Sequence, residues 1–102
     1  MTTHPAAKVG FLIRLELKPD KVMEFETQLR ASLLEIDNEP GTTAWFAVRL
    51  GSTSYAVFDV FPDDAARQAH LEAGRKRLSG LANLLAEPPS IVRTDVIAAK
   101  LP

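Results

Sequence analysis

The sequence predicts one α+β domain in which a four-stranded antiparallel sheet carries two helices, in the order strand, helix, strand, strand, helix, strand. Three observations predict this order. Segments of alternating apolar and polar residues indicate strands, apolar residues at intervals of three and four indicate helices, and Pro or Gly separates most segments. Because 102 residues provide for one hydrophobic core, we expect a single domain over residues 1–102, with residues 1–7 disordered.

The first strand is expected over residues 9–18, and the first helix follows it. Phe11, Ile13 and Leu15 share one face of this strand and alternate with residues that become more polar. Asp20 is the expected N-cap of the helix. Apolar residues then recur with helical spacing, at Val22, Phe25, Leu29, Leu33 and Ile36.

Two further strands, over residues 42–50 and 53–61, are expected to form a hairpin around Gly51. If Leu50 pairs with Thr53, alternate residues fall into two sets. One face then carries Trp45, Ala47, Ala56, Phe58 and Val60. The other face carries Ala44, Phe46, Val48, Tyr55, Val57, Asp59 and Phe61.

The second helix is expected to begin with Asp63 as its N-cap and to weaken at Gly74. A short helical piece over residues 78–86 and a last strand over residues 90–100 complete the chain. His70 lies within a stripe of small residues that we expect to face the sheet, namely Ala66, Ala69 and Ala73.

Right-handed crossovers place the strands in the order 4-1-3-2 with both helices on one face, which is a ferredoxin-like arrangement. Both faces of the hairpin are apolar, yet the helices can cover only one of them. Because an exposed apolar face of that size is unusual in a monomer, we expect a homodimer that pairs the uncovered sheet faces. Trp45 or Phe58 is expected to lie in this interface.

Composition and charge exclude several classes of function. With 12 basic and 13 acidic residues the net charge is −1, so we expect neither nucleic acid nor a membrane surface as a partner. The chain has no cysteine and two histidines, so we expect no metal site and no iron–sulfur cluster. Residues 1–8 lack the apolar segment of a signal peptide, and we therefore expect a cytoplasmic protein.

Two side chains are candidate catalytic residues. His70 can exchange a proton near neutral pH, although it can also be a hydrogen-bonded residue at the edge of the core. Asp59 interrupts an apolar strand, and a buried carboxylate needs a partner. It either orients His70, or lies at an exposed strand end, or pairs with Arg14, Arg49 or Arg67. The aromatic residues expected beside Asp59 would bind an aromatic substrate: Phe46, Tyr55 and Phe61.

The segment that runs from Asp59 to Ala66 and is followed by His70 resembles a signature of the antibiotic-biosynthesis-monooxygenase-like family. In that family a strand ending in Glu-x-Trp leads into an alanine-containing helix, with a His nine residues after the Trp. Phe61 and His70 have this spacing, and Glu39-Pro40-Gly41-Thr42 matches the family's approach to its second strand. The chain departs from the pattern because Asp59 replaces Glu and Phe61 replaces Trp.

The resemblance implies a dimeric α+β barrel with a pocket between the sheet and the helices of each subunit. It also implies a cofactor-independent monooxygenase that acts on an aromatic or enolisable small molecule, with His70 as general base. The alternative is a non-catalytic dimeric protein of the same fold that binds a small ligand. Haem binding, as in another branch of the family, is disfavoured because residues 9–18 contain no Asn and Lys76 and Arg77 stand where that branch has its axial His.

Overall fold

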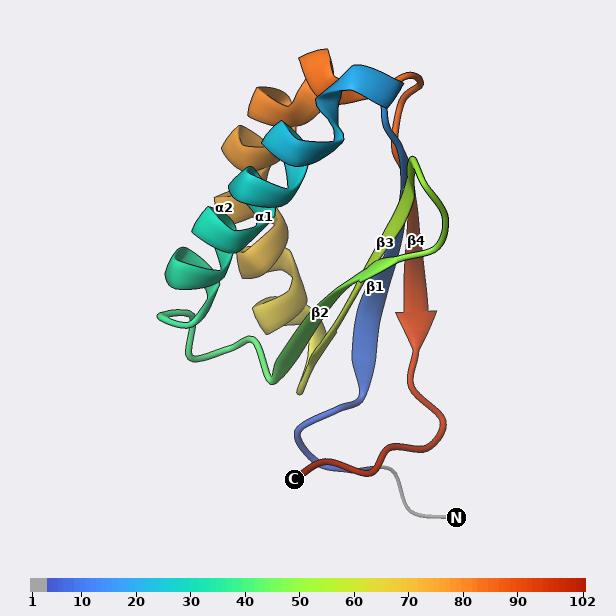
Figure 1. Cartoon of the computed structure of the whole chain (residues 1–102). Helices are drawn as coiled ribbons and strands as arrows, with labels where there is room; N and C mark the ends of the chain where they lie inside the picture. Colours follow the sequence, from blue (N-terminus) through green and yellow to red (C-terminus); the bar gives the residue numbers. More distant parts are fainter. Residues whose placement is uncertain (1–3) are drawn as a thin grey trace.

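The computed structural model describes residues 4–102 and shows the expected ferredoxin-like fold. Its main elements are β1 (Val9–Glu16), α1 (Val22–Ile36), β2 (Ala44–Arg49), β3 (Ser54–Phe61), α2 (Asp64–Leu81) and β4 (Ser90–Asp95). Short 3₁₀ turns, Pro19–Lys21 and Ala82–Leu84, flank the two helices. The strands form one antiparallel sheet in the order β2-β3-β1-β4, and both helices cover the same face of it (Figure 1).

The core lies between the helices and the covered face of the sheet. Phe11, Leu15 and Leu17 are buried there, as the alternation of the first strand predicts. Leu15 and Leu17 pack with Phe25 of α1 in a cluster that continues through Tyr55, Val57, Leu81, Leu84 and Leu85, whereas the ring of Phe11 packs against Phe61. The predicted N-cap is wrong, because Asp20 lies inside the 3₁₀ turn and α1 begins after it without a side-chain cap.

The register of the hairpin differs from the prediction by one residue. Arg49 pairs with Tyr55, and the amides of Leu50 and Gly51 both donate to the carbonyl of Ser54, so three residues rather than two form the connection. A shift of one residue exchanges the two faces of a strand. Trp45 therefore lies opposite Asp59 on the helix side, whereas Phe46 lies opposite Phe58 on the open face.

Helix α2 confirms its predicted start but not its predicted break. Asp63 caps the helix by accepting a hydrogen bond of 2.8 Å from the amide of Ala66. The helix continues through Gly74 to Leu81 because strong helix formers surround the glycine. The predicted alanine stripe is wrong, since Ala69 and Ala73 are exposed and the sheet-facing side carries other residues: Arg67, His70, Leu71, Gly74 and Leu81.

The first described residues are packed rather than disordered. The amide of Ala7 donates to the carbonyl of His4 at 3.1 Å, and Ala7 is fully buried. The expected disorder of residues 1–7 is therefore wrong for residues 4–7, and residues 1–3 lie outside the described part of the chain. Within residues 4–102, no helix is long and apolar enough to cross a membrane.

Candidate functional site

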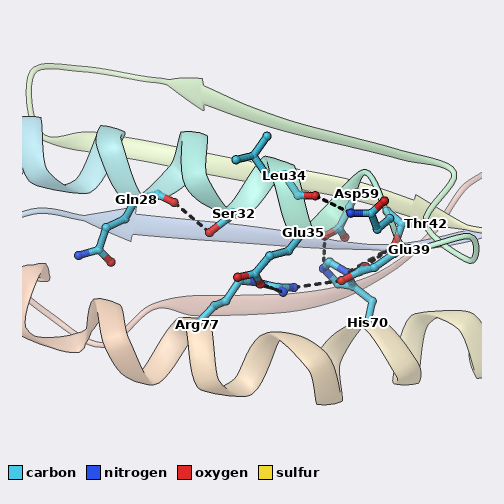
Figure 2. A network of polar contacts seen from close by, with 10 residues as sticks. Gln28, Ser32, Leu34, Glu35, Glu39, Thr42, Asp59, His70 and Arg77 are labelled. Carbon is cyan, nitrogen blue, oxygen red and sulfur yellow. Dashed lines mark hydrogen bonds and ion pairs between the residues drawn. The ribbon is translucent and has the colours of Figure 1, made fainter.

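The candidate site is a histidine held between two carboxylates. His70 of α2 places Nε2 3.1 Å from Asp59 Oδ2 on β3, and Nδ1 2.5 Å from Glu39 Oε1 in the segment that joins α1 to β2 (Figure 2). The exposed fraction of these side chains rises from 0% at Asp59 to 10% at His70 and 19% at Glu39. The three groups therefore form a polar path from the core toward the surface.

The close approach of β1 to β3 fixes Asp59. Phe11 donates its backbone N–H to Asp59 Oδ1 at 3.2 Å. A side chain at Gly10 would place its Cβ only 2.3 Å from the carbonyl oxygen of Asp59, so glycine permits this approach. Among the described residues, Asp59 Oδ2 has no hydrogen-bond partner beyond its contact with His70. A buried carboxylate oxygen in this position has only the imidazole to balance its charge.

Glu39 is held in place by a residue of α2 and by a residue of the following loop. Thr42 Oγ1 donates to Glu39 Oε1 at 2.8 Å, and Arg77 Nη2 lies 3.3 Å from Glu39 Oε2. Arg77 also donates to Glu35 Oε2 at 2.9 Å, which ties α2 to α1 (Figure 2). In the sequence Glu39 stands out only as part of the segment Glu39-Pro40-Gly41-Thr42, so only the structure reveals its contact with His70.

The protonation of His70 follows from these contacts. Burial acts to lower the pKa of His70, but the hydrogen bonds and negative charges of Asp59 and Glu39 outweigh it and raise the pKa. Burial acts to raise the pKa of Glu39, but hydrogen bonds from His70 and Thr42 outweigh it and lower the pKa. These contacts favour the imidazolium form, in which Nδ1 donates to Glu39 and Nε2 faces the carboxylate of Asp59.

An apolar cavity of about 70 Å³ lies beside Asp59 and His70, between the two helices and the sheet. Its lining includes Phe11, Leu29, Trp45, Val57 and Leu71. The cavity has room for a few water-sized groups as it stands. Beyond Leu29 and Trp45, a second and more open pocket of about 350 Å³ lies between α1 and β2.

The three predicted substrate-binding residues have different surroundings. Phe61 is buried against the ring of His70, with centroids 5.1 Å apart, and is not among the residues that line the cavity. Tyr55 lines the outer pocket and donates its hydroxyl to Glu26. Phe46 is 55% exposed on the open face, so its predicted place beside Asp59 is wrong. Trp45 takes that place instead.

In the described part of the chain, no group of three or more His, Asp or Glu side chains is arranged to hold a metal ion. Around His70 the reason is geometric, because the imidazole stands between the two carboxylates and each ring nitrogen faces one of them. The arrangement suits proton transfer, in which a histidine is oriented and charged by acidic partners.

This fold corresponds to that of a class of known structures. A candidate antibiotic biosynthesis monooxygenase from Caulobacter crescentus aligns with a TM-score of 0.79 and 20% identity, over 92% of this chain and 93% of that chain. Another from Nitrosomonas europaea gives 0.81 and 17%, over 94% and 96%. The resemblance found in the sequence is thus confirmed at the level of the fold.

A further relative is similar in sequence as well. The NE2512 protein of unknown function from Nitrosomonas europaea has 39% identity and a TM-score of 0.89, over 97% of this chain and 98% of that chain. The chain belongs to the same family as NE2512. No protein-family model matches the chain, and no curated protein is similar to it.

Proposed function

We propose that the protein is a cofactor-independent monooxygenase that oxidises an aromatic or enolisable small molecule with O2. The observation that carries this proposal is the nearly buried His70, held between Asp59 and Glu39 beside an apolar cavity. The fold shared with candidate antibiotic biosynthesis monooxygenases also supports it.

The chemistry requires the substrate to become electron-rich before O2 reacts with it. Neutral His70 accepts a proton from an activated C–H or phenolic O–H and becomes the imidazolium that Asp59 and Glu39 stabilise. The resulting carbanion or phenolate donates electrons to O2. An activated CH₂ group becomes a carbonyl, one oxygen atom enters the product, and the other leaves as water with the two hydrogens, so no separate reductant is needed.

Glu39 offers the proton a way out of the site. On the side of His70 that faces Glu39, a surface hollow of about 250 Å³ is lined by Thr42, Ala66 and Ala73 among others. Because Glu39 borders this hollow, it lies between the imidazole and solvent. The small alanine side chains, which do not face the sheet, leave room for water there.

The experiment compares O2 consumption by the wild-type protein and the His70→Ala variant over a panel of phenolic and enolisable compounds. Loss of a general base lowers turnover about 10²-fold or more. Since base catalysis needs the neutral imidazole, the wild-type rate rises with pH through the raised pKa of His70. His4→Ala is the matched control, because His4 contacts the amide of Ala6 and not this site. Full activity of His70→Ala contradicts the proposal.

A second candidate function is a non-catalytic dimeric protein that binds a small ligand. The cavity of about 70 Å³ favours it, because it is small for a polycyclic substrate, and both nitrogens of His70 already have partners. In this case a ligand binds without O2 consumption, and His70→Ala changes only its affinity.

We also propose that the protein is a homodimer that pairs the open sheet faces. One row of apolar residues crosses all four strands on this face and is partly exposed: Phe46, Phe58, Leu12 and Val92. Phe58→Glu would put charges into the interface, so light scattering is expected to show a monomer. Met23→Glu, on the 86% exposed Met23 of α1, is the control and leaves the dimer intact. A monomeric wild-type protein at micromolar concentration contradicts this proposal.

A further inference from the structure

The outer pocket has the size and lining of a ligand site. Its volume of about 350 Å³ falls within the usual range of small-molecule sites, about 300–1,000 Å³. Leu29, Leu33 and Trp45 supply an apolar wall, and Tyr55 and Arg49 border the polar end. The pocket shares Leu29 and Trp45 with the inner cavity, so one ligand can contact both.

The polar end carries more positive than negative charge. Glu26 accepts hydrogen bonds from the Tyr55 hydroxyl and from Arg49, which lower its pKa to about 2, and it also pairs with Arg30 at 3.4 Å. Two guanidinium groups therefore share one carboxylate. The side chains of Arg30 and Arg49 are 75% and 60% exposed, so part of each guanidinium remains open to a ligand.

The inner end has no such excess of positive charge. Asp59 and Glu39 face the imidazole of His70 there, and Arg77 pairs with Glu39 and with Glu35. Tyr55 and Asp59 are four residues apart on β3, and at about 3.4 Å per residue the two ends are about 14 Å apart. The anionic group of a ligand is thus attracted more strongly to the outer end than to the inner end, which gives the ligand one favoured orientation.

We propose that the outer pocket binds the carboxylate of an aromatic acid between Arg30 and Arg49, with its ring against Trp45 and its far end directed toward His70. The assignment of the far end as the reacting end rests on the proposed monooxygenase function. The binding of the acid does not, because it depends only on the charges and apolar surface of the outer pocket.

Trp45 makes this proposal testable without a substrate or turnover. It is the sole tryptophan of the sequence and lies in the wall that the ring would contact, so its fluorescence reports a bound ligand directly. The titrations use 4-phenylbutyrate and 4-phenylbutanol, which differ in charge and share the same ring and chain. We expect the carboxylate to bind about fivefold to tenfold more tightly, and added salt to reduce this preference.

Three variants test the assignment of the charges. Arg30→Gln with Arg49→Gln removes both guanidinium groups, so the carboxylate and the alcohol are expected to bind equally. Glu26→Gln removes the competing carboxylate, so 4-phenylbutyrate is expected to bind more tightly than to the wild type. Because Glu26→Gln keeps both arginines, it remains informative if the double variant folds poorly. Arg75→Gln is the matched control, since Arg75 pairs with Glu72 outside the pocket.

Equal affinities of the wild-type protein for the two compounds overturn the proposal. So does a carboxylate preference that survives in the double variant, or the absence of any fluorescence change at millimolar ligand. These results are distinct from a failure of the monooxygenase proposal, which appears as O2 consumption that does not depend on His70. Carboxylate binding without O2 consumption supports the site and favours the ligand-binding function.

Discussion

The layer between the helices and the sheet holds two polar networks, an inner one around His70 and an outer one around Glu26. In each, hydrogen bonds to a carboxylate hold its pKa below the usual range, at Glu39 in the inner network and at Glu26 in the outer. The inner network includes Asp59, which is fully buried, whereas the outer network includes two arginines that are mostly exposed.

This difference in burial determines what each network can do. Water cannot replace a lost partner of Asp59, so removing one member leaves an uncompensated group in a medium of low dielectric constant. Water readily replaces a lost partner of Arg30 or Arg49, and salt screens their charges. The inner network is therefore suited to fix structure and to hold a proton, and the outer network is suited to attract a charged ligand.

The largest expected effect is on the inner network. Asp59→Ala leaves the buried amide of Phe11 without its acceptor and His70 without one of its two carboxylates. We expect the free energy of unfolding to fall by about 3 kcal/mol, the usual cost of removing one partner of a buried polar pair. Urea denaturation checks this from the midpoint at constant slope.

Asp59→Asn separates the loss of the hydrogen bond to Phe11 from the loss of the negative charge beside His70. Asparagine keeps an oxygen acceptor for the amide of Phe11 but carries no charge. A loss clearly smaller than that of Asp59→Ala shows that the hydrogen bond to Phe11 carries much of the effect. If Asp59→Ala is as stable as the wild type, the inner network does not stabilise the fold.

The second prediction concerns the dependence of stability on pH. The pKa of His70 is raised above its ordinary value of 6.5, so its contribution is complete below pH 6.5 and is lost as the pH rises through the raised pKa. The pKa of Glu39 is lowered from 4.5, so its contribution is complete above pH 4.5 and is lost as the pH falls through the lowered pKa. We expect maximal stability between these limits, measured by urea denaturation at a series of pH values.

His70→Gln is the matched variant for this measurement. It keeps a polar side chain at the same position but cannot titrate, so the decline of stability above pH 6.5 is expected to disappear. A wild-type decline that persists unchanged in His70→Gln would assign it to another group.

The sequence predicted those parts of the fold in which polarity distinguishes inside from outside. The first strand has polar residues on one face only. Of the residues predicted on its other face, Phe11 and Leu15 are buried and Ile13 is half-buried. The hairpin has two apolar faces, so alternation did not indicate which face lies inside, and the register depended on the turn alone. A connection one residue longer than predicted exchanged the places of Trp45 and Phe46.

The candidate site was predicted in part. The contact of His70 with Asp59 is present, although the residues around His70 on the sheet-facing side are not the alanines that suggested it. The contact with Glu39 depends on the path of the chain between α1 and β2, and local periodicity gives no information about such a path. The acidic residue directly before Pro40 and Gly41 was the one signal that could have indicated it.

The third prediction tests the contribution of Glu39 to the pKa of His70. In Glu39→Gln the ring loses one of its two negative neighbours, so the pKa of His70 is expected to move down toward its ordinary value while staying influenced by Asp59. NMR titration of the ring carbon-bound protons measures this directly. Glu35→Gln is the control, because Glu35 contacts Arg77 and not the imidazole. An unchanged pKa of His70 in Glu39→Gln would mean that the two side chains do not interact in solution.

The smallest effect on stability is expected from Glu26→Gln in the outer network. Glutamine keeps an oxygen acceptor for the Tyr55 hydroxyl, and the released arginines become solvated, so the urea midpoint at neutral pH is expected to fall only slightly, far less than in Asp59→Ala. At acid pH the wild type and Glu26→Gln are expected to lose stability differently, because the pKa of Glu26 is lowered from 4.5 to about 2. Its contribution is complete above pH 4.5 and is lost toward pH 2, so this part of the acid decline is expected in the wild type and not in Glu26→Gln. High salt reduces the difference between the two proteins, since the charges are exposed. A midpoint shift as large as that of Asp59→Ala would show that both networks hold the fold, and burial would then not explain how they differ.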